Sequence, residues 1–78
     1  MVDIDIRVAG ENSFIVYFGD RPGPHLAQLI TDCCDRIKRE LAENLIDLLP
    51  SYASILVVYD SGVVDSYGVL AVLKQCTS

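Results

Sequence analysis

The sequence has few of the residues that build catalytic and metal sites. It contains no tryptophan, one histidine (His25) and three cysteines, at positions 33, 34 and 76. No CxxC spacing occurs, and a structural zinc ion needs four well-placed ligands, so a zinc site is not expected. Cys33 and Cys34 are adjacent and cannot form a disulfide with each other in a helix without distorting the backbone. An odd number of cysteines with no metal-binding spacing predicts reduced thiols.

Positive charge is also scarce. Eleven acidic residues outnumber six basic ones, which gives a formal net charge of −5. Arg36, Lys38 and Arg39 are interleaved with acidic neighbours, so they form no basic patch. Nucleic acids and anionic membrane surfaces attract concentrated positive charge, and neither is expected as a partner.

Long apolar runs and targeting signals are absent as well. No run approaches the roughly 20 apolar residues that span a bilayer. The first residues include Asp3 and Asp5, and they lack the basic and then apolar regions of a signal peptide. The sequence therefore predicts a cytoplasmic protein without a membrane segment.

Apolar side chains, by contrast, are abundant for a chain of this size. Hydrophobic residues make up 51% of the 78 residues. A single domain this small buries only about 60% of the surface that its unfolded chain would expose. Part of the apolar share must therefore lie on the surface, which predicts an interface with another domain or subunit.

Four segments have the patterns of β-strands. Residues 2–8 alternate between apolar and charged side chains, as in a half-buried strand. Residues 13–18 and 53–59 are apolar on both faces, which favours two central strands, and residues 45–49 form a shorter one. Gly10 and Asn12 suit a turn, so the first two strands are expected to form a hairpin.

The longest helical pattern begins at Pro24, whose missing N–H costs nothing at the first helical position. Two acid-first pairs four residues apart, Asp32–Arg36 and Asp35–Arg39, lie on its polar face, and Asn44 is the expected C-terminal cap. Apolar residues recur at spacings of three and four over roughly five turns. This stripe consists of Leu26, Leu29, Ile30, Cys33, Ile37 and Leu41.

A second helix is expected near the end of the chain, capped by Asp65 or Ser66. Its apolar side chains are Val69, Leu70, Val72 and Leu73. The order of elements is then β-β-α-β-β-α. A four-stranded antiparallel sheet with both helices on one face would bury every apolar stripe. The predicted fold is therefore α+β, a ferredoxin-like two-layer sandwich.

No catalytic set stands out in the sequence. A nucleophilic hydrolase needs a nucleophile, a base and an orienting group, and the chain offers Ser51, Ser54 and the single imidazole of His25. One histidine at a helix start fits a solvated side chain better than a general base. Residues 18–24 join a strand to a helix but lack the GxxxxGK[ST] pattern, and their prolines remove two amides that a phosphate would need. We therefore predict no catalytic, metal or cofactor site in these residues.

Tyr52 lies in the tight turn between the third and fourth predicted strands, where an aromatic ring has few ways to become buried. Two interpretations are open. Tyr17, Tyr52 and Tyr59 could all fill the core with their hydroxyls at its edge. Alternatively, Tyr52 packs on a neighbouring domain or subunit, because aromatic residues are enriched at interfaces. On the second interpretation, Pro50, Ser51 and Tyr52 are the candidate partner-binding residues.

Several short motifs occur in a fixed order: Gly10-Glu11, Ser13–Tyr17, Phe18-Gly19-Asp20, Pro50-Ser51-Tyr52-Ala53-Ser54 and Tyr59-Asp60. Each is weak alone. In this order and spacing they resemble the N-terminal domain of the allophanate hydrolase subunit 1 family. That family includes the B-type subunit of bacterial 5-oxoprolinase and the Kip-type inhibitor of a sporulation histidine kinase.

The resemblance implies that residues 1–78 are the N-terminal domain of a longer protein whose cyclophilin-like C-terminal domain is absent from this sequence. It implies a role with a subunit 2 partner in ATP-dependent amide-bond hydrolysis, with any ATP held in the full complex and no turnover by these residues alone. The alternative is an antikinase-type module that binds and inhibits a sensor histidine kinase. Self-association as a homodimer, through apolar surface or an open sheet edge, is a third expectation.

Overall fold

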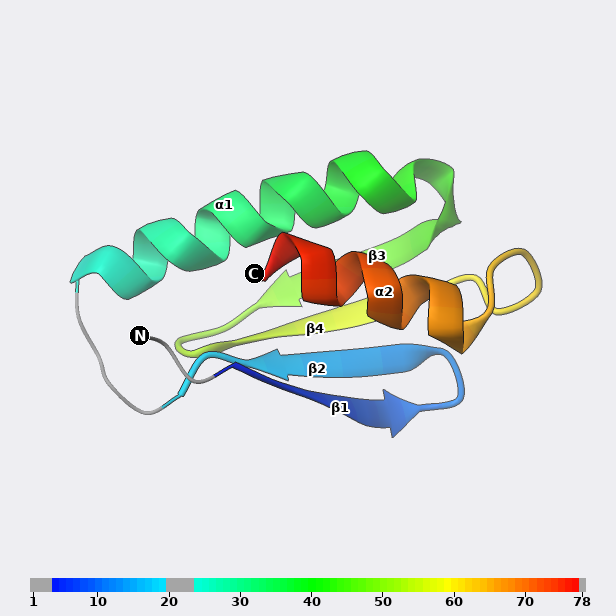
Figure 1. Cartoon of the computed structure of the whole chain (residues 1–78), viewed down its shortest axis with the longest axis horizontal. Helices are drawn as coiled ribbons and strands as arrows, with labels where there is room; N and C mark the ends of the chain where they lie inside the picture. The colour runs from blue at the N-terminus through cyan, green and yellow to red at the C-terminus, as the bar shows by residue number, and fades with distance from the viewer. Residues whose placement is uncertain (1–3, 20–23, 78) are drawn as a thin grey trace.

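The computed structural model describes residues 4–19 and 24–77 and shows the predicted order of elements (Figure 1). The elements are β1 (Asp5–Gly10), β2 (Ser13–Tyr17), α1 (Pro24–Leu41), the 3-10 turn η1 (Ala42–Asn44), β3 (Leu45–Pro50), β4 (Ser54–Tyr59) and α2 (Ser66–Cys76). The sheet has the strand order β1-β2-β4-β3, and every neighbouring pair is antiparallel. The β-β-α-β-β-α order is confirmed, and so is the placing of β2 and β4 in the middle of the sheet.

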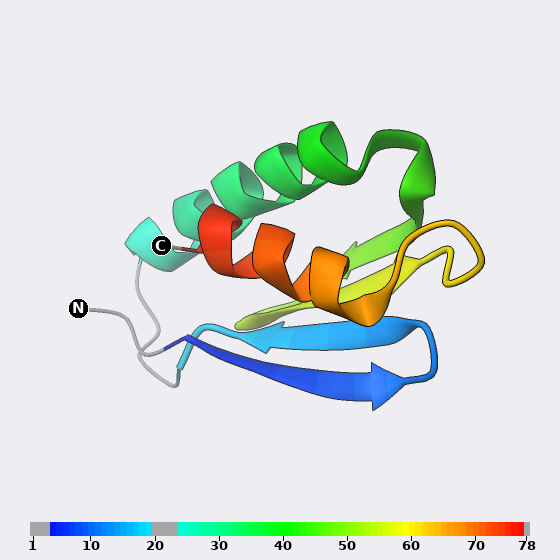
Figure 2. The same cartoon turned by 45° about the vertical axis from the view of Figure 1, so that its right-hand side comes forward.

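Both helices cover the same face of the sheet, as the two views in Figures 1 and 2 show. Along β2 and β4, the residues that point towards the helices are buried. The residues between them in sequence are half-buried or exposed. No helix in the described part of the chain covers the opposite face. The α+β two-layer sandwich of ferredoxin-like type is therefore confirmed.

The core lies between the sheet and the helices. Each residue of the predicted α1 stripe is buried except Leu29, which is partly buried, and Cys34 is buried beside them. The rings of Phe14 and Tyr59 stack with their centroids 5.7 Å apart, which joins the two central strands. The remaining core side chains come from β2 and the residue after it, from β4 and from α2: Val16, Phe18, Ile55, Val57, Val69, Leu73 and Cys76.

The first strand differs from its prediction. It begins at Asp5 and continues to Gly10, which was expected in the turn, and the pairing with β2 is irregular between Val8 and Gly10. Residues 2 and 3 of the predicted strand lie outside the described residues. Val8 was expected on the buried face but is 73% exposed, because β1 is an edge strand and the helix layer does not cover this end.

The C-terminal end of α1 also differs. The helix ends at Leu41, the last buried residue of its stripe, and Ala42 adopts a left-handed φ of 48°. Asn44 was the expected cap but is the last residue of η1, and its carbonyl accepts a hydrogen bond of 2.8 Å from the Asp60 N–H. The prediction was wrong because α1 ends at Leu41 and the next three residues form η1, which leads into β3.

The polar face of α1 makes other contacts than those predicted. Asp32 accepts a hydrogen bond of 2.9 Å from Gln28, and Arg36 donates one of 3.4 Å to the backbone carbonyl of Gln75 on α2. Among residues 4–19 and 24–77, only Arg7 and Asp5 form a salt bridge. The two ion pairs predicted along α1, Asp32–Arg36 and Asp35–Arg39, therefore do not form. Within the described part of the chain, neither helix is both long and apolar enough to cross a membrane.

Asp65 caps α2, which confirms one of the two residues predicted for that place. Its Oδ1 accepts a hydrogen bond of 2.7 Å from the Gly68 N–H.

We expect Asp65→Ala to cost about 1 kcal/mol of unfolding free energy, because an N–H in the first turn loses its partner. Thermal unfolding should show Tm lowered by roughly 4–8 °C. Ser66→Ala is the matched control with little expected effect, and the opposite ranking of the two variants would contradict the cap.

Candidate functional site

The hairpin between β3 and β4 holds the candidate partner-binding residues Pro50, Ser51 and Tyr52. Pro50 pairs with Ile55 at the end of β3 and is tolerated there because β3 is an edge strand. The Ser51 N–H donates a hydrogen bond of 2.7 Å to the Ser54 carbonyl and closes the turn. All three candidate side chains are exposed. We call residues 50–53 the hairpin tip.

The hairpin tip is fixed to the neighbouring strand. The carbonyl of Ala53 accepts a hydrogen bond of 2.9 Å from the N–H of Phe18, directly after β2. The backbone is therefore held on both sides of Tyr52, whose side chain is 73% exposed. Core filling describes Tyr59, which is 2% exposed, but it is wrong for Tyr52 and for Tyr17, which is 43% exposed. Tyr17 points to the face of the sheet that the two helices do not cover, and Tyr52 lies in the turn between β3 and β4.

An apolar surface adjoins the hairpin tip on the side of the sheet away from the helices. The register pairs Tyr17 with Ser54 and Leu49 with Leu56, and side chains of paired residues lie on the same face of a sheet. Leu56 lies between the buried residues Ile55 and Val57 and so points away from the core. We define the open sheet face by its apolar members: Ile15, Tyr17, Leu49, Leu56 and Val58.

The sequence did not identify Tyr17 and Leu49 as candidate contact residues. The signal was present, because residues 13–18 and 53–59 are apolar on both faces although helices cover only one of them. A sheet with a second apolar face has more apolar surface than its own helices bury. The candidate site therefore comprises the hairpin tip together with the open sheet face.

The side chains considered for catalysis are not assembled into a site. His25 is exposed at the start of α1, and no hydrogen bond in the described part of the chain joins it to Ser51 or Ser54. No group of three or more His, Cys, Asp or Glu side chains among residues 4–19 and 24–77 could hold a metal ion. Residues 20–23, most of the segment weighed as a phosphate loop, lie outside the described residues.

The three cysteines are free thiols buried in the helix layer, as expected for unpaired cysteines. The Sγ atom of Cys33 donates a hydrogen bond of 3.4 Å to the carbonyl of Cys76, which links α1 to the end of α2. Burial raises the pKa of Cys33, Cys34 and Cys76 above the ordinary thiol value. A buried thiol with a raised pKa is a poor nucleophile, so these side chains serve packing.

The family is decided by a match that covers nearly the whole chain. Residues 4–78 match the family model described as carboxyltransferase domain, subdomain C and D. The chain belongs to this family. It is the family of allophanate hydrolase subunit 1 and of the B-type subunit of 5-oxoprolinase, so the resemblance seen in the sequence is confirmed to that extent. A comparison with curated proteins gives no match.

A solved structure supports the carboxyltransferase subdomain fold. The chain is similar to a conserved uncharacterized protein from Pyrococcus horikoshii, with 30% sequence identity and a TM-score of 0.84. The similarity covers 94% of this chain and 34% of the Pyrococcus protein. The chain thus spans about a third of the length of that relative.

Proposed function

We propose that the chain is the N-terminal domain of a protein like allophanate hydrolase subunit 1 or the B-type subunit of 5-oxoprolinase. It acts with a subunit 2 partner in ATP-dependent amide-bond hydrolysis, and it contacts that partner, or a further domain, through the hairpin tip and the open sheet face. The carboxyltransferase family match supports this class of protein. The cytoplasmic location expected from the sequence is part of the proposal.

The observation that carries the contact role is the exposure of Tyr52 on a backbone that is fixed on both sides. An aromatic side chain offers a large contact area, and little conformational entropy is lost when its backbone is already held in place. Tyr17 lies at the same end of the sheet, since it pairs with Ser54, the first residue after the hairpin tip. The two rings and Leu49 can therefore enter one continuous interface.

ATP belongs to the complex in this proposal and not to these residues. In the described residues, Arg7 contacts the carboxylate of Asp5 and Arg36 donates to a backbone carbonyl on α2. We assign the chain no reaction step. Its part is to bind and orient the partner, and we expect no turnover by the chain alone.

The experiment that tests the proposal is a pull-down from native extract, with a full-length parent protein and the 78-residue chain as parallel baits. Recovery of a subunit 2 homologue, with ATP-dependent cleavage of 5-oxoproline or allophanate in the recovered complex, would support the hydrolase role. Failure to recover such a subunit from either bait would count against it.

The second candidate is an antikinase-type module, as in the Kip-type members named above. The same exposed hairpin tip favours it, because a rigid aromatic projection can dock on the helical dimerisation domain of a histidine kinase. Recovery of a histidine kinase whose autophosphorylation falls when the chain is added would favour this candidate over the hydrolase role.

Replacing Tyr52 with alanine is expected to weaken partner binding much more than folding. Loss of a central aromatic contact typically costs about 1–2 kcal/mol or more, which lowers affinity roughly tenfold. The unfolding free energy should change by no more than about 0.5 kcal/mol, because the side chain is largely in solvent. Isothermal titration against the recovered partner and urea unfolding measure the two quantities.

Tyr67→Ala is the matched control for this variant. Tyr67 is 82% exposed on α2, on the helix side of the sheet, so its removal should leave the affinity unchanged. A Tyr52→Ala protein that binds as tightly as the parent, or that unfolds outright, would remove the hairpin tip from the proposed interface.

A further inference from the structure

Strand β1 has one edge that no other strand among the described residues covers. The order β1-β2-β4-β3 places it at the border of the sheet, and within the described residues its only strand partner is β2. An uncovered edge presents unpaired backbone N–H and C=O groups to any extended segment with a suitable pattern of side chains. The pattern on β1 itself is therefore informative.

Two residues of opposite charge, Asp5 and Arg7, flank Ile6 in β1. Asp5 and Arg7 pair with Tyr17 and Ile15, which places them on the open sheet face, while Ile6 points towards the helices. The Nε atom of Arg7 donates to Oδ2 of Asp5 at 2.6 Å, and the two side chains are 70% and 54% exposed. Ile6 thus has an acid on one side and a base on the other, both accessible from outside.

We propose that β1 pairs with β1 of a second copy of the chain, antiparallel, about a two-fold axis through Ile6. This register sets Asp5 of each copy opposite Arg7 of the other, and opposite charges in directly facing positions attract. Antiparallel registers centred on Asp5 or on Arg7 would set like charges against each other. The charges therefore select one register, in which the two sheets become a single eight-stranded sheet with an isologous interface.

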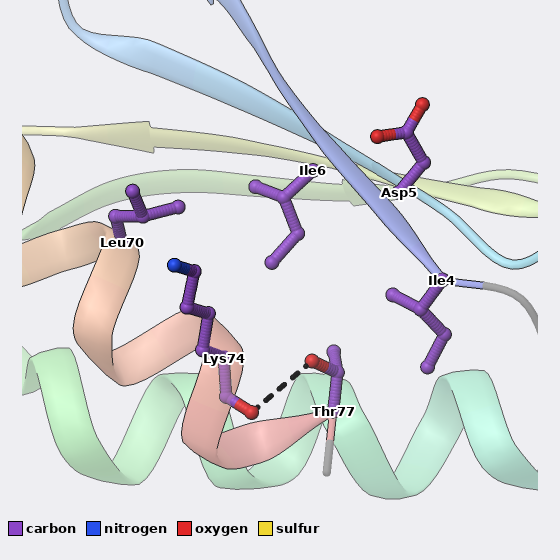
Figure 3. A pocket seen from close by; sticks show the side chains of 6 residues that line it. All are labelled: Ile4, Asp5, Ile6, Leu70, Lys74 and Thr77. Carbon is purple, nitrogen blue, oxygen red and sulfur yellow. Dashed lines mark hydrogen bonds between the residues drawn. The ribbon is translucent and has the colours of Figure 1, made fainter.

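The apolar side chains of β1 that point towards the helices also favour the pairing of a second strand with its edge. Ile4 and Ile6 form the β-strand wall of an open groove of about 560 Å³ whose other wall consists of Leu70, Lys74 and Thr77 on and after α2. Figure 3 shows the two isoleucines directed towards α2, while Asp5 points to the other side of the strand. Val8, at the far end of the same row, is 73% exposed.

In the proposed register, Val8 of the second copy lies opposite Ile4, and the two Ile6 side chains face each other. The apolar side chains Ile4, Ile6 and Val8 of one strand then pack against those of the other, and Val8 becomes less exposed to solvent. A strand from an unrelated partner could pair with the same edge. A second copy of β1, however, always carries charges complementary to Asp5 and Arg7. This inference goes beyond the proposed function, because it concerns backbone pairing at the outer edge of β1, although Asp5 lies opposite Tyr17 of the open sheet face.

The test uses two single charge reversals, Arg7→Asp and Asp5→Arg. Each variant sets like charges opposite each other twice in its own homodimer, so each should dimerise roughly tenfold or more weakly than the parent. An equimolar mixture of the two variants restores opposite charges at all four positions and should form a heterodimer. Sedimentation velocity over a range of concentrations measures each species.

Matched controls carry the same charge changes elsewhere. Arg39→Asp and Asp35→Arg lie on the exposed face of α1 and should dimerise like the parent. Circular dichroism and Tm confirm that all variants are folded. The proposal would be overturned by a parent chain that stays monomeric at every concentration, by single variants that dimerise as well as the parent, or by a mixture that forms no heterodimer.

Discussion

Replacing Ile37 with alanine is expected to remove a large part of the free energy of unfolding of this domain. Ile37 is fully buried in the middle of the α1 stripe. Removing three carbons from such a site costs about 2–5 kcal/mol, the lost transfer energy plus the cavity left behind. A 78-residue domain has a total unfolding free energy of only ~4–12 kcal/mol. Urea unfolding should show the midpoint shifted strongly downward with an unchanged slope.

Ile46→Ala is the control that makes the same chemical change at an exposed position. Ile46 is 60% exposed in β3, so its truncation should alter the unfolding free energy by no more than about 0.5 kcal/mol. Ile37→Val should fall between the two, at about 0.5–1.5 kcal/mol. Equal effects at the two isoleucines would mean that α1 does not pack on the sheet in solution as it does in the structure.

The arrangement of the layers could be predicted because burial follows periodicity. Ile37 lies on a helical stripe with spacings of three and four, and Val16 and Val57 lie on strands that are apolar on both faces. A helix with one apolar stripe must face the sheet, and strands apolar on both faces must lie in its middle. These constraints leave few arrangements of two helices and four strands, and the structure has the one predicted.

The details that the sequence did not predict depend on what neighbouring elements offer. Arg36 could pair with Asp32 along its own helix, but in the fold a carbonyl at the end of α2 lies within its reach. Ala42 carries the left-handed φ that an asparagine would adopt more readily, because the path into β3 requires the reversal at that position. Local spacing contains no information about such distant partners.

The candidate site was only partly predictable for a similar reason. Tyr52 could be identified from its turn, whereas Tyr17 has the pattern of a core residue and becomes a surface residue only because the helices cover one face of the sheet. A contact surface has no fixed spacing of chemical groups comparable to that of a metal or phosphate site. The family therefore came from the order of motifs along the chain and not from the chemistry of any one residue.

The stability of the fold is expected to fall in alkaline solution. Burial raises the pKa of Cys33, Cys34 and Cys76, so the folded chain keeps these thiols protonated where the unfolded chain has lost the protons. Below the unfolded thiol pKa of about 8.5 this contribution is fully present. As the pH rises towards the folded pKa values, the unfolded state binds fewer protons, and each thiol can remove about 1.4 kcal/mol of unfolding free energy per pH unit.

Urea unfolding between about pH 7 and about pH 10 measures this loss, but tyrosine and lysine side chains also titrate near the upper end. The decisive quantity is therefore the difference between the parent and a variant with Cys33→Ala, Cys34→Ala and Cys76→Ala. The variant starts from a lower stability because it loses three buried sulfur atoms, yet its stability should decline less with pH. If the parent and the variant decline with equal slopes above about pH 8.5, the thiols do not control the alkaline limit of this fold.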